Sequence, residues 1–119
     1  MKYVLSVMLC CFLMVACQSK YDVTQMHGEW KTVQWIKSNS GNSVNNPMNF
    51  KFDSDDRYEV DYGSETEVGR YWIAGDYLHT VEEGRAEKKV RIIKLTKDSL
   101  EFEMNRAGYL EMVTLVRQN

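Results

Sequence analysis

The sequence predicts an all-β protein, an eight-stranded antiparallel up-and-down β-barrel. Short segments in which apolar and polar residues alternate follow one another along most of the chain. A period of two is typical of half-buried strands, turn-forming residues separate the segments, and no stretch of ten or more residues has a helical period. Because an open meander would leave two edges unpaired, closure into a barrel is favoured. A two-sheet β-sandwich is the alternative.

Each strand is predicted from its own alternation and from the turn residues that bound it. The clearest hairpin joins Met48–Asp53 to Arg57–Tyr62, and each of its strands has one apolar and one charged face. A longer loop is expected over Ser38–Pro47, and a single helical turn near Val23–Met26. The expected strands are Gly28–Lys37, Met48–Asp53, Arg57–Tyr62, Glu67–Ala74, Tyr77–Glu82, Lys88–Leu95, Ser99–Met104 and Tyr109–Arg117.

The apolar faces of the strands are expected to fill the barrel. An eight-stranded barrel is just wide enough to be packed with side chains or to hold one small ligand, so a packed core and a narrow pocket both stay open. The pocket would be lined by Tyr58, Tyr62, Tyr71 and Phe102, and its tyrosine hydroxyls would need partners. The expected inward residues are Met48, Phe50, Phe52, Tyr58, Val60, Tyr62, Tyr71, Ile73, Leu100, Phe102 and Met104.

Alternation also predicts what lies outside the barrel. Trp35 and Trp72 point opposite to Ile36 and Ile73 if both strands keep their register, and exposed tryptophans suggest a contact surface. The alternative is that one of them packs beneath the loop. A basic cluster interspersed with glutamates is predicted to be a solvated face, with anionic lipid or an acidic partner as the alternative. It consists of Arg85, Lys88, Lys89, Arg91, Lys94 and Lys97.

The first 17 residues indicate where the protein resides. Lys2 precedes an apolar stretch with a small-residue end, as in a secretory signal, and the stretch is shorter than the ~20 residues of a membrane span. Its end, Leu13 to Cys17, resembles the lipobox of bacterial lipoproteins. That resemblance implies cleavage before Cys17, which is then acylated. Ordinary secretion with a free Cys17 is the alternative. The expected organisation is a signal peptide over 1–16, a lipidated tether and leading turn over 17–27, and a barrel domain over 28–119.

Three motifs along the rest of the chain resemble those of lipocalin-like bacterial lipoproteins. They are Gly28-Glu29-Trp30, the set Gly69, Tyr71, Ile73, Gly75 and Asp76, and the hairpin Leu95–Leu100. The resemblance implies an eight-stranded barrel closed at one end by Trp30. It also implies that Arg117, on the last strand, stacks over the Trp30 ring, a cation–π contact worth around 0.5–2 kcal/mol.

Composition and spacing argue against several kinds of chemistry. The net charge of −2 suggests no nucleic-acid partner, and the signal removes every cysteine except Cys17, so no disulfide is expected. Asp53, Asp55 and Asp56 are too few for a calcium loop and predict a turn. His27 and His79 lie on separate elements, so no metal site is expected. No nucleophile or phosphate-loop motif appears, and we expect neither catalysis nor a cofactor.

Two functions remain open from the sequence. The first is binding of a small apolar or amphipathic ligand in or at the mouth of the barrel, which follows mainly from the family resemblance. The second is a protein-interaction or inhibitor module of the cell envelope with a fully packed barrel. In both, the N-terminal lipid would anchor the protein to a membrane of the bacterial envelope, with the outer membrane expected.

Overall fold

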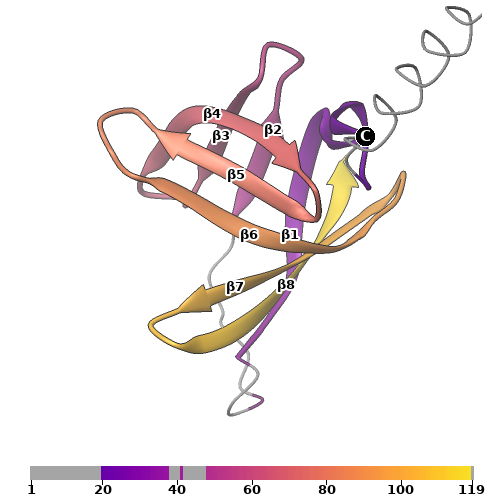
Figure 1. Cartoon of the computed structure of the whole chain (residues 1–119), viewed down its shortest axis with the longest axis vertical. Coiled ribbons are helices and arrows are strands. Elements are labelled where there is room, and N and C mark those ends of the chain that lie inside the picture. The colour runs from indigo at the N-terminus through magenta and orange to yellow at the C-terminus, as the bar shows by residue number, and fades with distance from the viewer. Residues whose placement is uncertain (1–19, 38–40, 42–47, 119) are drawn as a thin grey trace, which may run out of the picture.

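The computed structural model describes residues 20–37, 41 and 48–118. Over these residues, eight antiparallel strands follow one another around a closed barrel, in the order in which they occur in the sequence. The first strand closes the barrel against the last, and Figure 1 shows β1 and β8 side by side. The predicted up-and-down barrel is therefore confirmed, and the sandwich alternative is wrong. The expected signal peptide, Cys17 and most of the loop Ser38–Pro47 lie outside the described residues.

The strands begin and end within two residues of the predicted positions. The single helical turn is also present, as the 3-10 turn η2 (Val23–Met26). The strands are β1 (Gly28–Lys37), β2 (Asn49–Phe52), β3 (Arg57–Asp61), β4 (Thr66–Ala74), β5 (Tyr77–Glu82), β6 (Glu87–Leu95), β7 (Ser99–Arg106) and β8 (Tyr109–Gln118). Within the described residues, no helix is long and apolar enough to cross a bilayer.

One end of the barrel is closed by η2 and by Trp30. The Trp30 side chain is fully buried, and its Nε1 donates a hydrogen bond of 2.9 Å to the Met26 carbonyl oxygen. The Arg117 guanidinium lies over the indole, 4.2 Å from the ring centroid, as the family resemblance implied. Arg117 also donates to the carbonyl oxygens of Gln25 and Lys97, at 2.7 and 2.6 Å. The Arg117 guanidinium, on β8, thus connects η2 and the β6–β7 turn through hydrogen bonds.

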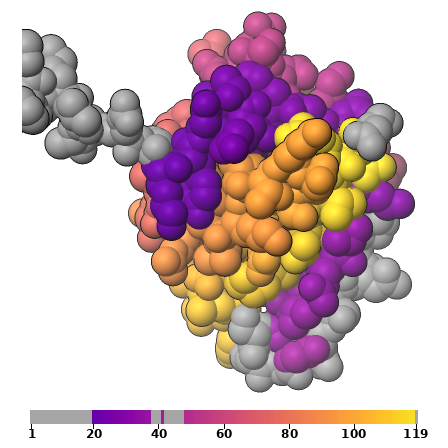
Figure 2. Space-filling view, turned by 90° about the vertical axis from the view of Figure 1, so that its right-hand side faces the viewer, coloured from indigo at the N-terminus to yellow at the C-terminus, as the bar shows by residue number. Residues whose placement is uncertain are grey.

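The segment that leads into the barrel packs on its outside near the closed end. The Tyr21 hydroxyl lies 3.4 Å from the carbonyl oxygens of Ile92 and Ile93 in β6, and Figure 2 shows the indigo N-terminal residues against the orange residues of β6. Together with Val23 and the buried Met26, Tyr21 belongs to the packed structure. Packing therefore begins several residues before Gly28, the first residue of β1.

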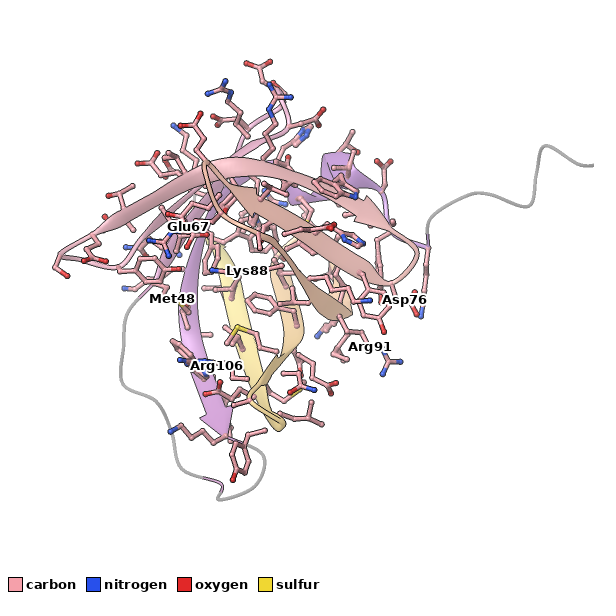
Figure 3. The ribbon with its side chains drawn as sticks, turned by 60° about the vertical axis from the view of Figure 1, so that its left-hand side comes forward. Met48, Glu67, Asp76, Lys88, Arg91 and Arg106 are labelled. Atoms are coloured by element: carbon pink, nitrogen blue, oxygen red, sulfur yellow. The ribbon has the colours of Figure 1, made fainter. Side chains whose placement is uncertain are left out.

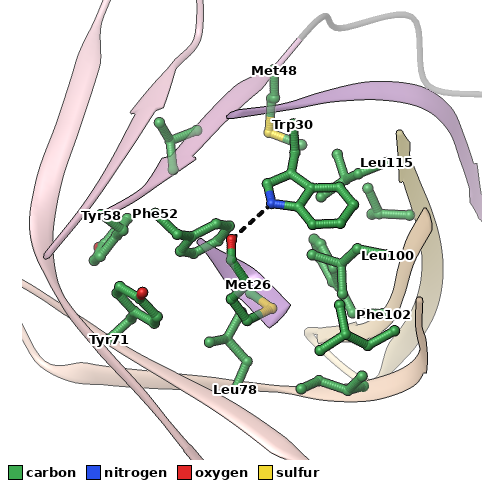
Figure 4. Packing of buried hydrophobic residues seen from close by; sticks show 14 of the residues in the cluster. Met26, Trp30, Met48, Phe52, Tyr58, Tyr71, Leu78, Leu100, Phe102 and Leu115 are labelled. Carbon is green, nitrogen blue, oxygen red and sulfur yellow. Dashed lines mark hydrogen bonds between the residues drawn. The ribbon is translucent and has the colours of Figure 1, made fainter. Parts of the chain in front are cut away.

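All the predicted inward residues lie in the core or pack against it. Figure 4 shows the Trp30 indole close to Leu100 and Leu115, with Phe52, Tyr58 and Tyr71 on the other side of Met26. Phe52 and Tyr71 meet edge to face, with ring centroids 4.9 Å apart, a geometry that suits the quadrupoles of two aromatic rings. The closed half of the barrel is thus a well-packed aromatic core.

The prediction that Trp35 lies outside the barrel is wrong. A β-bulge between Thr32 and Gln34 inserts one residue into β1 relative to β8, and an inserted residue moves every later side chain to the opposite face. Trp35 consequently pairs with Val113, a core residue, and is only 6% exposed. It is Val33, at the bulge, that is exposed instead.

Candidate ligand-binding site

A cavity of about 490 Å³ occupies the end of the barrel opposite to Trp30. Its walls come from strands all around the barrel and are mainly apolar, and small-molecule sites commonly have volumes of about 300–1,000 Å³. Of the two alternatives that the sequence left open, a packed core and a narrow pocket, the structure has the pocket in this half of the barrel. Its lining consists of Trp35, Met48, Phe50, Phe52, Tyr58, Val60, Tyr62, Glu67, Leu78, Thr80, Lys88, Lys89, Val90, Phe102, Met104, Asn105 and Arg106.

Two of the predicted pocket tyrosines converge on one carboxylate inside the cavity. The Tyr58 hydroxyl donates to Glu67 Oε2 at 2.5 Å, and the Tyr62 hydroxyl donates to Glu67 Oε1 at 3.1 Å. Lys88 Nζ lies 3.9 Å from Glu67 Oε1. Tyr58 and Tyr62 are four residues apart across the end of β3, and Glu67 is on the neighbouring β4. The tight β3–β4 connection therefore brings all three polar groups together.

The environment of these tyrosines keeps them protonated. Burial is the main cause that raises the pKa of Tyr62 to about 12, with the negative charge of Glu67 adding to it and the guanidinium of Arg106 opposing it. Burial and the hydrogen bond to Glu67 likewise raise the pKa of Tyr58. At neutral pH both phenols are therefore donors, and both donate to Glu67. The carboxylate oxygens of Glu67 are satisfied within the protein.

Tyr71 does not line the cavity, contrary to the prediction from its alternation. Its hydroxyl donates a hydrogen bond of 2.7 Å to the Asp53 carbonyl oxygen, in the β2–β3 turn at the closed end. Four residues separate Tyr71 from Glu67 along β4, about 13 Å at the rise of a strand. Tyr71 faces inward as expected, but it lies near the closed end of the barrel, too far from the cavity to line it. The other predicted pocket residues, Tyr58, Tyr62 and Phe102, do lie together in the lining.

A second buried carboxylate lies beside the cavity, beneath Trp35. Glu111 is only 3% exposed; its Oε1 accepts a hydrogen bond of 3.2 Å from Trp35 Nε1. Its Oε2 has no hydrogen-bond partner among the described residues, and Arg106 Nε lies 3.5 Å from it. The Arg106 guanidinium is also 6.0 Å from the Trp35 ring. Arg106 therefore compensates the charge of Glu111 while its far end reaches the cavity mouth.

Trp72 is the predicted outer tryptophan that the structure places outside. It is 41% exposed and stacks on His79 of β5, with ring centroids 5.2 Å apart and nearly parallel planes. His79 Nδ1 lies 2.7 Å from Glu87 Oε1, and Lys89 Nζ lies 4.8 Å from the Tyr77 ring centroid. No group of three or more potential metal ligands occurs among the described residues. A contact role for Trp72 stays a prediction.

Four charged residues at or beside the cavity were not predicted from the sequence as site residues, because charged side chains are expected on the outer face of a strand. Glu67 alternates with Gly69, Tyr71 and Ile73 in β4, and Glu111 alternates with Val113 and Leu115 in β8. An acidic residue on the apolar side of an alternating strand is the signal that identifies both. Lys88 and Arg106 follow the same rule in β6 and β7. These two cations were not predicted as site residues, because Lys88 belongs to the basic cluster and Arg106 lies near a turn. Both settings suggest a solvated side chain.

Comparisons with known proteins agree with the architecture. A family model described as a lipocalin-like domain matches residues 26–102. The fold is similar to the crystal structure of a lipocalin-like protein from Bacteroides uniformis, with a TM-score of 0.59 and 17% sequence identity. That similarity covers 80% of this chain and 99% of the other. No curated protein matches the sequence. The closed eight-stranded barrel and the family match over more than half of the chain together show that this protein belongs to the lipocalin-like domain family.

Proposed function

We propose that this protein binds a small apolar or amphipathic ligand in the open end of its barrel and has no catalytic activity. The observation that carries the proposal is the cavity of about 490 Å³. Apolar side chains form most of its wall, and a few polar groups converge at its mouth, an arrangement typical of ligand sites. The lipocalin-like fold is consistent with binding of a small molecule.

Filling the cavity is expected to abolish ligand binding. The test uses the unlipidated chain, meaning the full sequence with Cys17→Ser, and the neutral apolar dye N-phenyl-1-naphthylamine, whose fluorescence rises in apolar sites. Val90→Trp places a bulky ring in the cavity, because Val90 lines it. We expect at least a ten-fold loss of dye affinity. The matched control is Val68→Trp, the same change at an exposed position of β4.

The outcomes of this test separate the two functions. Dye binding that is lost in Val90→Trp and kept in Val68→Trp supports the ligand site. Absence of dye binding, or equal binding by both variants, would contradict it and favour a second candidate function, a protein-interaction or inhibitor module of the envelope. The observation that supports this candidate is the exposed aromatic pair Trp72 and Tyr77 beside Lys89 on the outer surface.

We further propose that Cys17 carries lipid and anchors the barrel to a membrane of the bacterial envelope, the outer membrane being expected. The support is the lipobox-like sequence that ends at Cys17. Tyr21, four residues later, already packs on β6 near the closed end, and four residues span at most about 14 Å. The closed end would then lie next to the bilayer, and the cavity mouth would open away from it.

Mass spectrometry of the intact protein extracted from its own membrane tests the anchor. We expect a chain that begins at residue 17 and carries the added mass of acyl groups, and the Cys17→Ser variant should lack this mass. A mature protein with an unmodified Cys17 thiol would refute the anchor. The same spectrum reports any small molecule that stays bound.

A further inference from the structure

The cavity mouth carries two cations that face inward from neighbouring strands. Lys88 of β6 pairs with Thr80 of β5, and both line the cavity. Arg106 of β7 follows Phe102 and Met104 at alternate positions, and these also line it. Figure 3 shows Lys88 and Arg106 on the same side of the barrel as Glu67 and Met48, whereas Asp76 and Arg91 lie on the other side. Both cations are therefore part of one opening.

The acidic groups of the mouth are buried and already paired. Glu67, whose side chain is 14% exposed, accepts from Tyr58 and Tyr62 and lies near Lys88. Glu111, whose side chain is 4% exposed, accepts from Trp35 and lies near Arg106. The negative charge of each carboxylate is therefore already offset within the protein, for Glu67 by two hydrogen bonds and Lys88, and for Glu111 by Trp35 and Arg106.

The hydrogen-bond donors of the mouth are, by contrast, exposed and mostly unused. The side chains of Lys88 and Arg106 are 64% and 62% exposed. Among the residues that the structure describes, Lys88 Nζ lies 3.9 Å from Glu67, too long for a hydrogen bond, and Arg106 Nε lies 3.5 Å from Glu111. Within the described part of the chain, Arg106 donates no hydrogen bond to Glu111 Oε2. An ammonium has three N–H donors, and a guanidinium is a planar fork that suits an oxyanion.

We propose that the ligand of this cavity is a single-chain amphiphile with an anionic head group. Its apolar chain extends toward Leu78 and Phe102, and its carboxylate lies at the mouth between Lys88 and Arg106. The inference rests on the proposed ligand-binding function and adds the class of ligand to it. A cationic head group is disfavoured because Glu67 is already hydrogen-bonded to two phenols. A neutral head group would form no ion pair with the exposed ends of Lys88 and Arg106.

The head-group preference is measured by competition for the dye on the unlipidated chain. Dodecanoate, dodecanol and dodecylammonium share one apolar chain and differ only in charge. We expect dodecanoate to displace the dye at about ten-fold lower concentration than dodecanol, a difference of about 1.4 kcal/mol. Dodecylammonium should be the weakest competitor. The advantage of dodecanoate should shrink at high salt, because exposed charges are screened.

Charge-removing variants locate the head group. Lys88→Gln and Arg106→Gln should each reduce the preference for dodecanoate by three-fold or more while leaving displacement by dodecanol unchanged. Lys94→Gln removes the same charge from the same strand at an exposed position that does not line the cavity, so its preference should equal that of the parent. Circular dichroism spectra establish that each variant is folded.

The possible results distinguish this inference from the proposed function. If the dye binds but dodecanol competes as well as dodecanoate, or if Lys88→Gln and Arg106→Gln behave like Lys94→Gln, the anionic head group is refuted and the cavity remains a ligand site. If dodecylammonium competes best, Glu67 is the group that binds the head, and the inference is overturned. If the dye does not bind the parent chain, the proposed function fails and the inference fails with it.

Discussion

Replacing Trp30 with alanine should lower the free energy of unfolding by about 3–5 kcal/mol, the usual cost of truncating a buried tryptophan. Three interactions are lost together. The indole is fully buried against the core, its Nε1 donates to the Met26 carbonyl oxygen at 2.9 Å, and Arg117 lies over its face at 4.2 Å. Since small domains are commonly stable by only 5–15 kcal/mol, this single change removes a large share of the stability.

Urea unfolding of the unlipidated chain, followed by far-ultraviolet circular dichroism, measures the effect without relying on tryptophan fluorescence. Trp72→Ala is the matched control, because Trp72 is partly exposed on the outer face and contacts chiefly the His79 ring. It should cost less than about 1.5 kcal/mol. Trp30→Phe should fall between the two, since it keeps an aromatic ring and leaves the Met26 carbonyl without its donor. Equal losses for Trp30→Ala and Trp72→Ala would contradict a structural role at the closed end.

Replacing Gly69 with alanine should also destabilise the barrel strongly, by about 3 kcal/mol or more. A Cβ atom at Gly69 would lie 2.8 Å from the Val81 carbonyl carbon and 2.9 Å from the Glu82 Cα, with the Val81 oxygen closer still. These are backbone atoms of the paired strand β5, so no change of rotamer relieves the overlap. Overpacking of a core costs about 1–3 kcal/mol when side chains can adjust, and here the strands themselves must separate.

Gly84→Ala provides the control for Gly69→Ala. Gly84 lies in the β5–β6 turn, where nothing lies within 4 Å of an added Cβ, but its φ of +76° is unfavourable for alanine. We expect a loss of about 1–2 kcal/mol from this backbone strain. Urea midpoints of the two variants compare steric overlap with conformational strain directly. A Gly69→Ala midpoint at or above that of Gly84→Ala would show that β4 and β5 can move apart at little cost.

Local patterns were sufficient to predict most of the fold. Strand positions follow from alternation and turn residues, both of which act over a few neighbouring positions. The turn at Val23–Met26 and the stacking of Arg117 on Trp30 also agree with the structure, the latter through family resemblance. The strands and the turn depend on which residues are apolar and on where the chain reverses, and the sequence shows both directly.

The wrong prediction for Trp35 has a different origin. A β-bulge arises from how two strands are matched along their whole length, and nothing in Thr32, Val33 or Gln34 specifies it. Because of this one inserted residue, Trp35 faces inward and donates a hydrogen bond to Glu111, whereas a surface position had been expected. The assignment of Tyr71 to the pocket failed because alternation specifies the face of a residue and leaves its depth along the barrel open.

The sequence left a packed core and a narrow pocket both open and could not decide between them. Bulky residues such as Phe50, Phe102 and Met104 suggested a filled interior, yet the space they leave depends on barrel curvature and on the direction of each side chain. The carboxylate of Glu67 between two tyrosines likewise results from the meeting of β3 and β4.

By itself, the sequence determined the all-β class and the number and order of the strands, and the family resemblance implied the residues that close one end of the barrel. Only the tertiary structure decided that the other end is hollow, that Trp35 faces inward, and that Lys88 and Arg106 share its mouth. The physical reason is the separation along the chain over which each interaction acts. Alternation and turn propensity act between neighbours in the chain, whereas register, bulges and enclosed space arise from contacts between strands that are distant in sequence.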